Sequence, residues 1–510
     1  MCLTSLPSSA SASPAPFGEA EAKQQLRQAE RAQSASMPTD LTVALRDLAL
    51  ALPKLNGAAE RRARSILARP PDGSGSADEA RWPSNADEKL VEMPAFVVHY
   101  AEVPGCDASP PSPDPNCDEP DLADEDFNGI PDYVDATVAA VNESIAVENG
   151  ELGWPLPKGD GQEGEPSGSS QENRFDVYLA DLCDESDFDP CLFGYASPDD
   201  SSAECNGAPY LCSAHLVLDN DYASDEFGAS GGELGLRVTT AHEYNHALQF
   251  NLDSNQDAWM LESTATWSEE KVFPDDDDWV RSYMDSWAER SLVPITKPKR
   301  RFYGSAVWNH WLENGDNSFG PDVVLSAWQS SREVTPNDYA VGAYDDAIED
   351  EGGAGFPQEF AAFTAATSEW KSGDGSFPNA SELPDVTRQD KIGLGDKSRK
   401  QVLDNTSYAL FDVSPGGADS ITLKGRSGGG VQWSVALVGR TGDRVSGTVD
   451  RRMAYSGGGE RRSVTLADAR SYDRITAVVT NADGHVSGKK PPFGEFNYTR
   501  NGEVFRLKVR

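Results

Sequence analysis

The stretch His242-Glu243-Tyr244-Asn245-His246 decides how the rest of this chain is interpreted. Residues four apart in a helix lie one turn apart on the same face, so His242 and His246 can bind a single metal ion. Glu243 projects beside them, where its carboxylate can take a proton from a metal-bound water. The flanking residues contain no proline. They supply apolar side chains for a buried helix face at Leu236, Ala241, Ala247 and Leu248.

A catalytic zinc site needs a third protein ligand and an open position for water. Glu262, 16 residues after His246, is the predicted third ligand, with Glu269 and Glu270 as alternatives. The polar residues 251–257 predict a turn between two helices, so that the second helix presents Glu262 to the first. The next histidine lies 64 residues beyond the motif, which argues against three histidine ligands. The alternative interpretation is a surface helix with chance histidines and a solvated Glu262.

The motif and Glu262 together resemble the gluzincin class of zinc metallopeptidases. More narrowly, "AHEYNHALQF" followed by "AWMLESTATWSEE" resembles a family of predicted secreted bacterial metalloproteases. The resemblance extends over residues 90–315 through "FVVHY", "DEDFNGIPDYVD" and "YGSAVWNHWLE". It implies a zincin-like catalytic domain with zinc bound by His242, His246 and Glu262.

One position departs from the gluzincin pattern. Many gluzincins carry an acidic residue four positions after the glutamate ligand, where it orients a histidine, and Thr266 stands there in this chain. Ser263, Thr266 or Glu269 are the alternatives for that role.

The chemistry expected of such a site is hydrolysis by a metal-activated water. Zinc polarises the scissile carbonyl and lowers the pKa of its bound water to about 7. Glu243 accepts the water proton and returns it to the leaving amine. In several gluzincins a tyrosine downstream of the third ligand stabilises the oxyanion, and Tyr303 is the candidate for this role here. The alternative is that Tyr303 packs at a helix start with its hydroxyl at the surface.

Residues 124–135 carry a second metal signal, with the ligand spacing of a calcium loop. Positions 1, 3, 5, 9 and 12 hold Asp124, Asp126, Asn128, Asp132 and Asp135. Gly129 stands where the loop turns sharply, and Ile130 offers its carbonyl at position 7. Asp at position 12 and Pro131 depart from an EF-hand. The loop is therefore a tentative Ca²⁺ site with a structural role, and an acidic turn without an ion is the alternative.

Charge and cysteine usage indicate the partners and the compartment. With 84 acidic against 44 basic residues the net charge is -40, so nucleic acid and anionic membranes are poor partners. No stretch is long and apolar enough for a transmembrane segment. Six of the seven cysteines predict local disulfides in sequential order, although six cysteines allow 15 pairings. The predicted pairs are Cys106–Cys117, Cys183–Cys191 and Cys205–Cys212.

Such pairs indicate an oxidising compartment, so we expect a protein that is secreted or held at the cell surface. Residues 1–7 show no basic region and no long apolar core, so no signal peptide is visible. We expect that the printed start lies downstream of the true one.

The chain divides by composition into five parts. Residues 1–36 look disordered, and residues 37–85 predict a helix from Leu41 to Leu67 plus a linker, either a propeptide or a stalk. Residues 86–375 predict the zincin-like domain, in which His215–Asp219 is expected to be the edge strand that accepts an extended substrate. Residues 376–400 resemble a linker. Residues 401–510 predict a β-sandwich that binds a surface or polymer, or only stabilises the enzyme.

The sequence therefore predicts an α+β protein acting as a secreted zinc-dependent endopeptidase on protein or peptide substrates. Two alternatives stay open: a zinc amidase acting on another substrate, and a catalytically inactive zincin-fold protein that serves in binding or adhesion. Retention of Glu243 argues against the inactive form. A serine hydrolase is poorly supported, because no G-x-S-x-G motif occurs.

Overall fold

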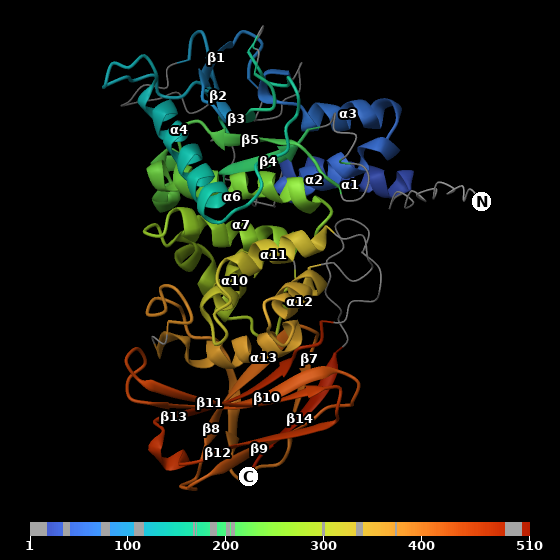
Figure 1. The fold of residues 1–510 in the computed structure, drawn as a ribbon, viewed down its shortest axis with the longest axis vertical. Coiled ribbons are helices and arrows are strands. Elements are labelled where there is room, and N and C mark those ends of the chain that lie inside the picture. Colours follow the sequence, from blue (N-terminus) through green and yellow to red (C-terminus); the bar gives the residue numbers. More distant parts are fainter. Residues whose placement is uncertain are drawn as a thin grey trace, which may run out of the picture.

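The chain is a mixed α+β protein in which helical, sheet-and-helix and strand-rich parts follow one another (Figure 1). This computed structural model describes residues 18–33, 41–72, 82–106, 117–166, 169, 171–183, 191–199, 205, 210–297, 301–332, 340–372, 375–484 and 502–510. Among the helices within these ranges, none is long and apolar enough to cross a membrane.

The N-terminal part consists of three helices, α1 (Glu19–Gln33), α2 (Leu41–Ala51) and α3 (Gly57–Leu67). The prediction of disorder for residues 1–36 is wrong for α1, because Ala22, Leu26 and Ala29 form a narrow buried stripe packed against α2. Residues 1–17 and 34–36 lie outside the described residues.

The predicted single helix from Leu41 to Leu67 is interrupted. It changes to a 3-10 turn at Leu52–Lys54, because proline at position 53 cannot continue the helical hydrogen bonding. A new helix, α3, then begins at Gly57.

A five-stranded sheet forms the next part, in the order β1-β2-β3-β5-β4. Its strands are β1 (Asp87–Glu92), β2 (Phe96–Glu102), β3 (Phe175–Ala180), β4 (Gly194–Pro198) and β5 (Ala214–Asp219). The pairs β2–β3 and β3–β5 are parallel, whereas β4 runs antiparallel to β5. The predicted edge strand His215–Asp219 is therefore wrong: it is an interior strand, buried along its whole length. The edge strands are β1 and β4, and β4 is the one that pairs with β5.

A long helix covers this sheet, and a second long helix packed on it leads into a helical layer. Helix α6 (Gly232–Asp253) packs on β4 and β5, and α7 (Ala258–Val272) packs on α6. The layer before and after them consists of α4 (Asp132–Ser144), η3 (Ile145–Glu151), α5 (Ser224–Phe227), η6 (Val280–Met284), α8 (Asp285–Ala288), α9 (Arg301–Gly304), α10 (Ala306–Asn314), α11 (Asp322–Ser331), α12 (Val341–Asp350) and α13 (Phe356–Ala366). Tryptophans fill the layer, among them Trp259, Trp267, Trp308 and Trp328.

The C-terminal part consists of two sheets around a shared core that includes Phe411, Trp433 and Phe505. One sheet has the order β11-β10-β13-β8-β6 and the other β12-β9-β14-β7. The strands are β6 (Arg388–Gly393), β7 (Arg399–Leu403), β8 (Ser407–Ser414), β9 (Ile421–Arg426), β10 (Gln432–Thr441), β11 (Thr448–Gly457), β12 (Arg461–Leu466), β13 (Arg474–Asn481) and β14 (Glu503–Val509). Helix α13 packs on β10, β11 and β13, which joins this part to the helical layer (Figure 1).

The predicted linker 376–400 is wrong at residues 399–400, which begin β7, and at residues 388–393. Residues 388–393 form β6, which pairs in parallel with β8. The sequence hides this strand because it is almost entirely polar, and only Ile392 is buried.

The three predicted disulfides are confirmed. The Cα–Cα distances are 5.8 Å for Cys106–Cys117, 4.6 Å for Cys183–Cys191 and 4.4 Å for Cys205–Cys212. All three lie in connections of the five-stranded sheet. Each disulfide closes a short loop and so lowers the conformational entropy of that connection in the unfolded state.

Candidate metal centre

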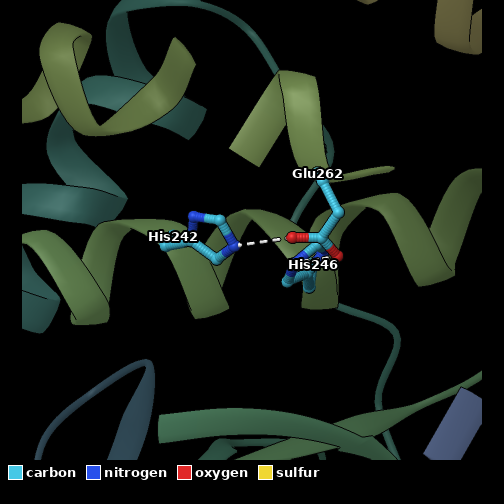
Figure 2. A group of neighbouring side chains, drawn as sticks. All are labelled: His242, His246 and Glu262. Carbon is cyan, nitrogen blue, oxygen red and sulfur yellow. Dashed lines mark hydrogen bonds and ion pairs between the residues drawn. The ribbon is translucent and has the colours of Figure 1, made fainter. Parts of the chain in front are cut away.

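Helices α6 and α7 bring His242, His246 and Glu262 together (Figure 2). His242 Nε2 lies 3.2 Å from Glu262 Oε2, and His246 Nε2 lies 3.5 Å from Glu262 Oε1. The two imidazole rings are 4.8 Å apart between centroids, and all three residues are buried. The predicted turn at 251–257 is shorter in the structure, because α6 continues to Asp253 and α7 begins at Ala258. Residues 254–257 return the chain so that Glu262 faces the motif.

The protonation of His246 follows from its contact with Gln249. The Gln249 amide nitrogen donates to Asn245 Oδ1 at 2.5 Å and to the Leu261 carbonyl at 3.0 Å, so its oxygen is the atom that faces the ring. His246 Nδ1 lies 2.8 Å from that oxygen and must donate to it. The remaining nitrogen, Nε2, therefore presents its lone pair to Glu262 when the ring is neutral.

Glu269 fixes His242 in the same way. His242 Nδ1 lies 2.6 Å from Glu269 Oε1, where the carboxylate accepts the ring proton. His242 Nε2 then faces Glu262. Of the three alternatives for this orienting role, the structure selects Glu269. Ser263 instead bonds the Met260 carbonyl, and Thr266 Oγ1 is buried without a hydrogen bond among the described residues.

Three electron-pair donors therefore converge on one point. Within the described residues, His246 Nε2 and Glu262 Oε1 are buried atoms that make no hydrogen bond. Buried polar atoms without partners are costly, so such a group calls for a positive charge between its members. Two imidazole nitrogens and one carboxylate are a donor set that fits Zn²⁺ with a position left for water.

The pKa values of His242 and the two glutamates also indicate that the site favours positive charge. Burial lowers the pKa of His242, but its bonds to Glu262 and Glu269 outweigh burial and raise the pKa well above its ordinary value. Burial raises the pKa of Glu262, but the effect of the two histidines is larger, so the pKa is lowered below its ordinary value. Burial raises the pKa of Glu269 to about 7. A carboxylate pair facing imidazoles in this way accommodates either a proton or a divalent cation.

A cavity of about 350 Å³ opens onto these residues. Glu243 lines it beside the histidines and is buried. Tyr303, on α9, also lines it, with its ring 5.8 Å from the His242 ring. Tyr283 stacks on Tyr303 with ring centroids 4.9 Å apart, and it lines the same cavity. Both phenols therefore belong to the cavity wall. The remaining lining residues include Leu41, Thr42, Gly194, Val238, Asp278 and Ser282.

The sequence interpretation missed a buried network behind His246. Asn245 Nδ2 donates to Glu148 Oε2 at 2.6 Å, and Asn245 in turn accepts from Gln249. Glu148 lies on η3 and is fully buried, which raises its pKa to about 8. Helical spacing offers a signal for Gln249, which stands three residues after His246. No local signal exists for Glu148, which is nearly 100 positions from its partner.

Glu270, one of the alternative third ligands, lies away from the centre. Its Oε2 accepts from Trp279 Nε1 at 3.1 Å, and its pKa is raised to about 8, chiefly by burial. His310 packs against Trp279 with ring centroids 4.6 Å apart, and burial lowers its pKa to about 3. It therefore has the structural environment expected of a neutral core histidine.

The acidic loop before α4 gathers part of its predicted ligand set. Carboxylate oxygens of Asp124, Asp126 and Asp132 lie within 4.8 Å of one another. Asn128 Nδ2 donates to Asp126 at 3.2 Å and to Asp135 at 2.7 Å, which ties Asp135 to the loop through the amide. The Ile130 backbone N–H donates to Asn128 Oδ1 at 2.7 Å, consistent with a tight turn there.

Comparisons with known proteins add little. No protein-family model matches the chain, and no curated protein is similar to it. Among solved structures, a family GH115 4-O-methyl-alpha-glucuronidase with specificity for decorated arabinogalactans aligns at 9% sequence identity and a TM-score of 0.13. The alignment covers 66% of this chain and 52% of that one, so it spans about half of the glucuronidase. A likeness this weak carries no argument about fold or function.

Proposed function

We propose that this chain is a zinc-dependent endopeptidase of zincin type, resembling the gluzincins. The observation that carries the proposal is the convergence of His242 Nε2, His246 Nε2 and the Glu262 carboxylate. Glu269 and Gln249 hold the ring protons on Nδ1 of His242 and His246, so that both Nε2 atoms face the metal position. This is the arrangement that a catalytic zinc requires of its ligands.

The ligands in this proposal are His242, His246 and Glu262. When bound, zinc would polarise the scissile carbonyl and lower the pKa of its water to about 7. Glu243 lines the cavity next to these ligands, accepts the proton of the attacking water and delivers it to the leaving amine. Tyr303 donates its phenolic proton to the oxygen on which negative charge develops, and Tyr283 supports it by stacking.

We also propose that the loop 124–135 binds Ca²⁺ through Asp124, Asp126 and Asp132, with Asn128 and Asp135 as further oxygen donors. The loop leads directly into α4 and η3, and η3 carries Glu148. Binding there would stabilise the helix that holds the network behind His246. The three disulfides fit work in an oxidising compartment outside the cell.

The test is hydrolysis of casein or gelatin by the purified chain, with and without a zinc chelator, together with metal analysis. Glu243→Ala should keep its zinc and lose activity, whereas Glu262→Ala should lose both. Glu233→Ala is the matched control, because Glu233 lies in the exposed first turn of the same helix.

Two other outcomes would replace the proposal. Bound zinc without hydrolysis of any peptide would indicate an inactive binding protein. Chelator-sensitive hydrolysis of simple amides but not of peptides would indicate an amidase.

A further inference from the structure

We infer that residues 41–55, called the inhibitory segment below, block the substrate groove of the intact chain. Thr42 occupies the two groups that an incoming peptide would need. The inference rests on the proposed function, since it concerns regulation of the same site. Its starting point is that Leu41 and Thr42 line the cavity at the metal centre, although they lie some 200 residues before the motif.

The Thr42 hydroxyl makes two hydrogen bonds, one as donor and one as acceptor. Its Oγ1 donates to Glu243 Oε2 at 2.9 Å and accepts from the Ala196 backbone N–H at 3.1 Å. The first bond occupies the carboxylate that the proposed mechanism uses as the general base. This bond takes one of the two carboxylate oxygens of Glu243, so the Thr42 hydroxyl competes with a water for that oxygen.

The second bond occupies the edge of the sheet. Strand β4 pairs with β5 on one side only, so the Ala196 N–H that reaches Thr42 points to the open side. An extended peptide adds to such an edge through backbone hydrogen bonds. Helix α2 packs against β4 at this edge, as Figure 1 shows, so a peptide cannot pair there while α2 is in place.

A buried arginine anchors the inhibitory segment. Arg46 Nη1 donates to the carbonyls of Ser254 at 2.7 Å and Gln256 at 2.8 Å, and its Nε pairs with Asp47 at 2.7 Å. These carbonyls belong to the turn between α6 and α7, the two helices that carry the metal ligands. The segment is therefore attached to the turn between the two ligand-bearing helices and, through Thr42, to Glu243.

The inhibitory segment is nevertheless not part of the sheet or of the helices that carry the metal ligands. It contributes no strand to the sheet and no metal ligand. Leu45, Leu48 and Leu52 are buried, and Thr42 supplies the hydrogen bonds to Glu243 and to strand β4. A mutation of Thr42 can therefore remove its hydrogen bonds to Glu243 and Ala196 without altering any residue of the proposed catalytic machinery.

The experiment uses the full chain with Thr42→Val, which keeps the shape and removes both bonds, and Thr42→Val combined with Arg46→Ala. Thr42→Ser keeps the hydroxyl and is the matched control. Arg61→Ala, on an exposed position of α3, controls for changes in the N-terminal part. Circular dichroism and Tm establish that each variant is folded.

Two readouts are followed, and one is independent of activity. The first is amide hydrogen exchange in a peptide covering residues 193–199, which contains the Ala196 N–H. The second is chelator-sensitive hydrolysis of casein. In Thr42→Val, and more strongly in the double variant, we expect about tenfold faster exchange at β4 and about a tenfold rise in hydrolysis. Thr42→Ser and Arg61→Ala should match the unmodified chain.

Unchanged exchange at β4 in folded variants would overturn the inference. So would an unmodified chain that hydrolyses casein as fast as the variants, and in that case the peptidase function would stand. Faster exchange with no hydrolysis by any form would support occupation of the groove and overturn the peptidase function instead.

Discussion

Glu269 accepts the Nδ1 proton of His242 across 2.6 Å, although the resemblance to gluzincins points to position 266 for this contact. Positions 262, 266 and 269 all lie on one face of a helix, since they are spaced by four and seven residues. The acidic group is thus displaced by one turn along the same face of α7. Thr266, which takes its place, is buried.

Replacing Glu269 by Gln should lower zinc affinity about 10–100-fold, because the amide accepts the His242 proton less strongly and can present its NH₂ group instead. Competition with a chromogenic chelator measures the affinity. Thr266→Val is the matched control on the same helix, and its affinity should be unchanged. Equal affinities for Glu269→Gln and the unmodified chain would show that the contact does not orient a ligand.

Glu148 should make the free energy of unfolding fall as pH rises. Burial raises its folded-state pKa to about 8 from an ordinary value of 4.5, so between these pH values the folded chain holds a proton that the unfolded chain has released. Glu148→Gln removes this ionisation. The variant should therefore gain stability relative to the unmodified chain at pH 8, on the order of 2–4 kcal/mol, but not at pH 4.

Urea denaturation at a series of pH values measures this difference. Asp118, Asp181 and Asp219 also have pKa values raised to about 7–8, chiefly by burial, and add a slope of the same sign to both proteins. Only the difference between the two proteins is attributed to Glu148. Parallel curves for the two proteins would contradict the prediction.

Tyr303→Phe should lower kcat about 100–1000-fold with little change in KM, because a donor to the oxyanion acts in the transition state. Tyr283→Phe provides the comparison, since its ring stacks on Tyr303 and the substitution leaves that stacking intact. Steady-state kinetics on a fluorogenic peptide separate the two parameters. A larger loss of kcat in Tyr283→Phe would assign the donor role to Tyr283.

Calcium should raise the Tm of the chain through the loop before α4. At a concentration one hundred times the Kd, the ligand adds about 2.7 kcal/mol to the free energy of unfolding. Differential scanning calorimetry with and without Ca²⁺ measures the effect. Asp126→Asn should abolish it, whereas Asp121→Asn, just outside the cluster, should not. An equal shift in both variants would place the calcium effect elsewhere.

The sequence predicts the contacts between residues that lie close together along the chain. The two histidines, Glu262 across a short turn and the three local disulfides all depend on residues less than 25 positions apart, and the structure brings them together. Helical and loop geometry fix such contacts before the rest of the chain folds. The assignment of zinc and of peptidase activity stays a prediction.

The sequence does not predict contacts that depend on the packing of distant elements. Thr42 meets Glu243 across 201 positions, and Asn245 meets Glu148 across 97. Strand β4 was missed because Gly194 and Pro198 at its ends suggest a loop, and its glycine permits the close approach of Thr239 on α6. The polar composition of α1 and β6 concealed elements whose burial comes from neighbours.

Strand β4 stands between two of the cystine bridges. Cys183–Cys191 precedes it and Cys205–Cys212 follows it, and the Cys212 backbone N–H bonds the Phe250 carbonyl on α6 at 2.9 Å. Strand β4, to which the proposed function assigns the peptide, is thus tethered at both ends by disulfides. A chain synthesised in a reducing cytosol would carry the histidines and Glu262 on their helices but lack a fixed rim beside them. Under the proposed function, catalytic competence would then arise only once these disulfides have formed.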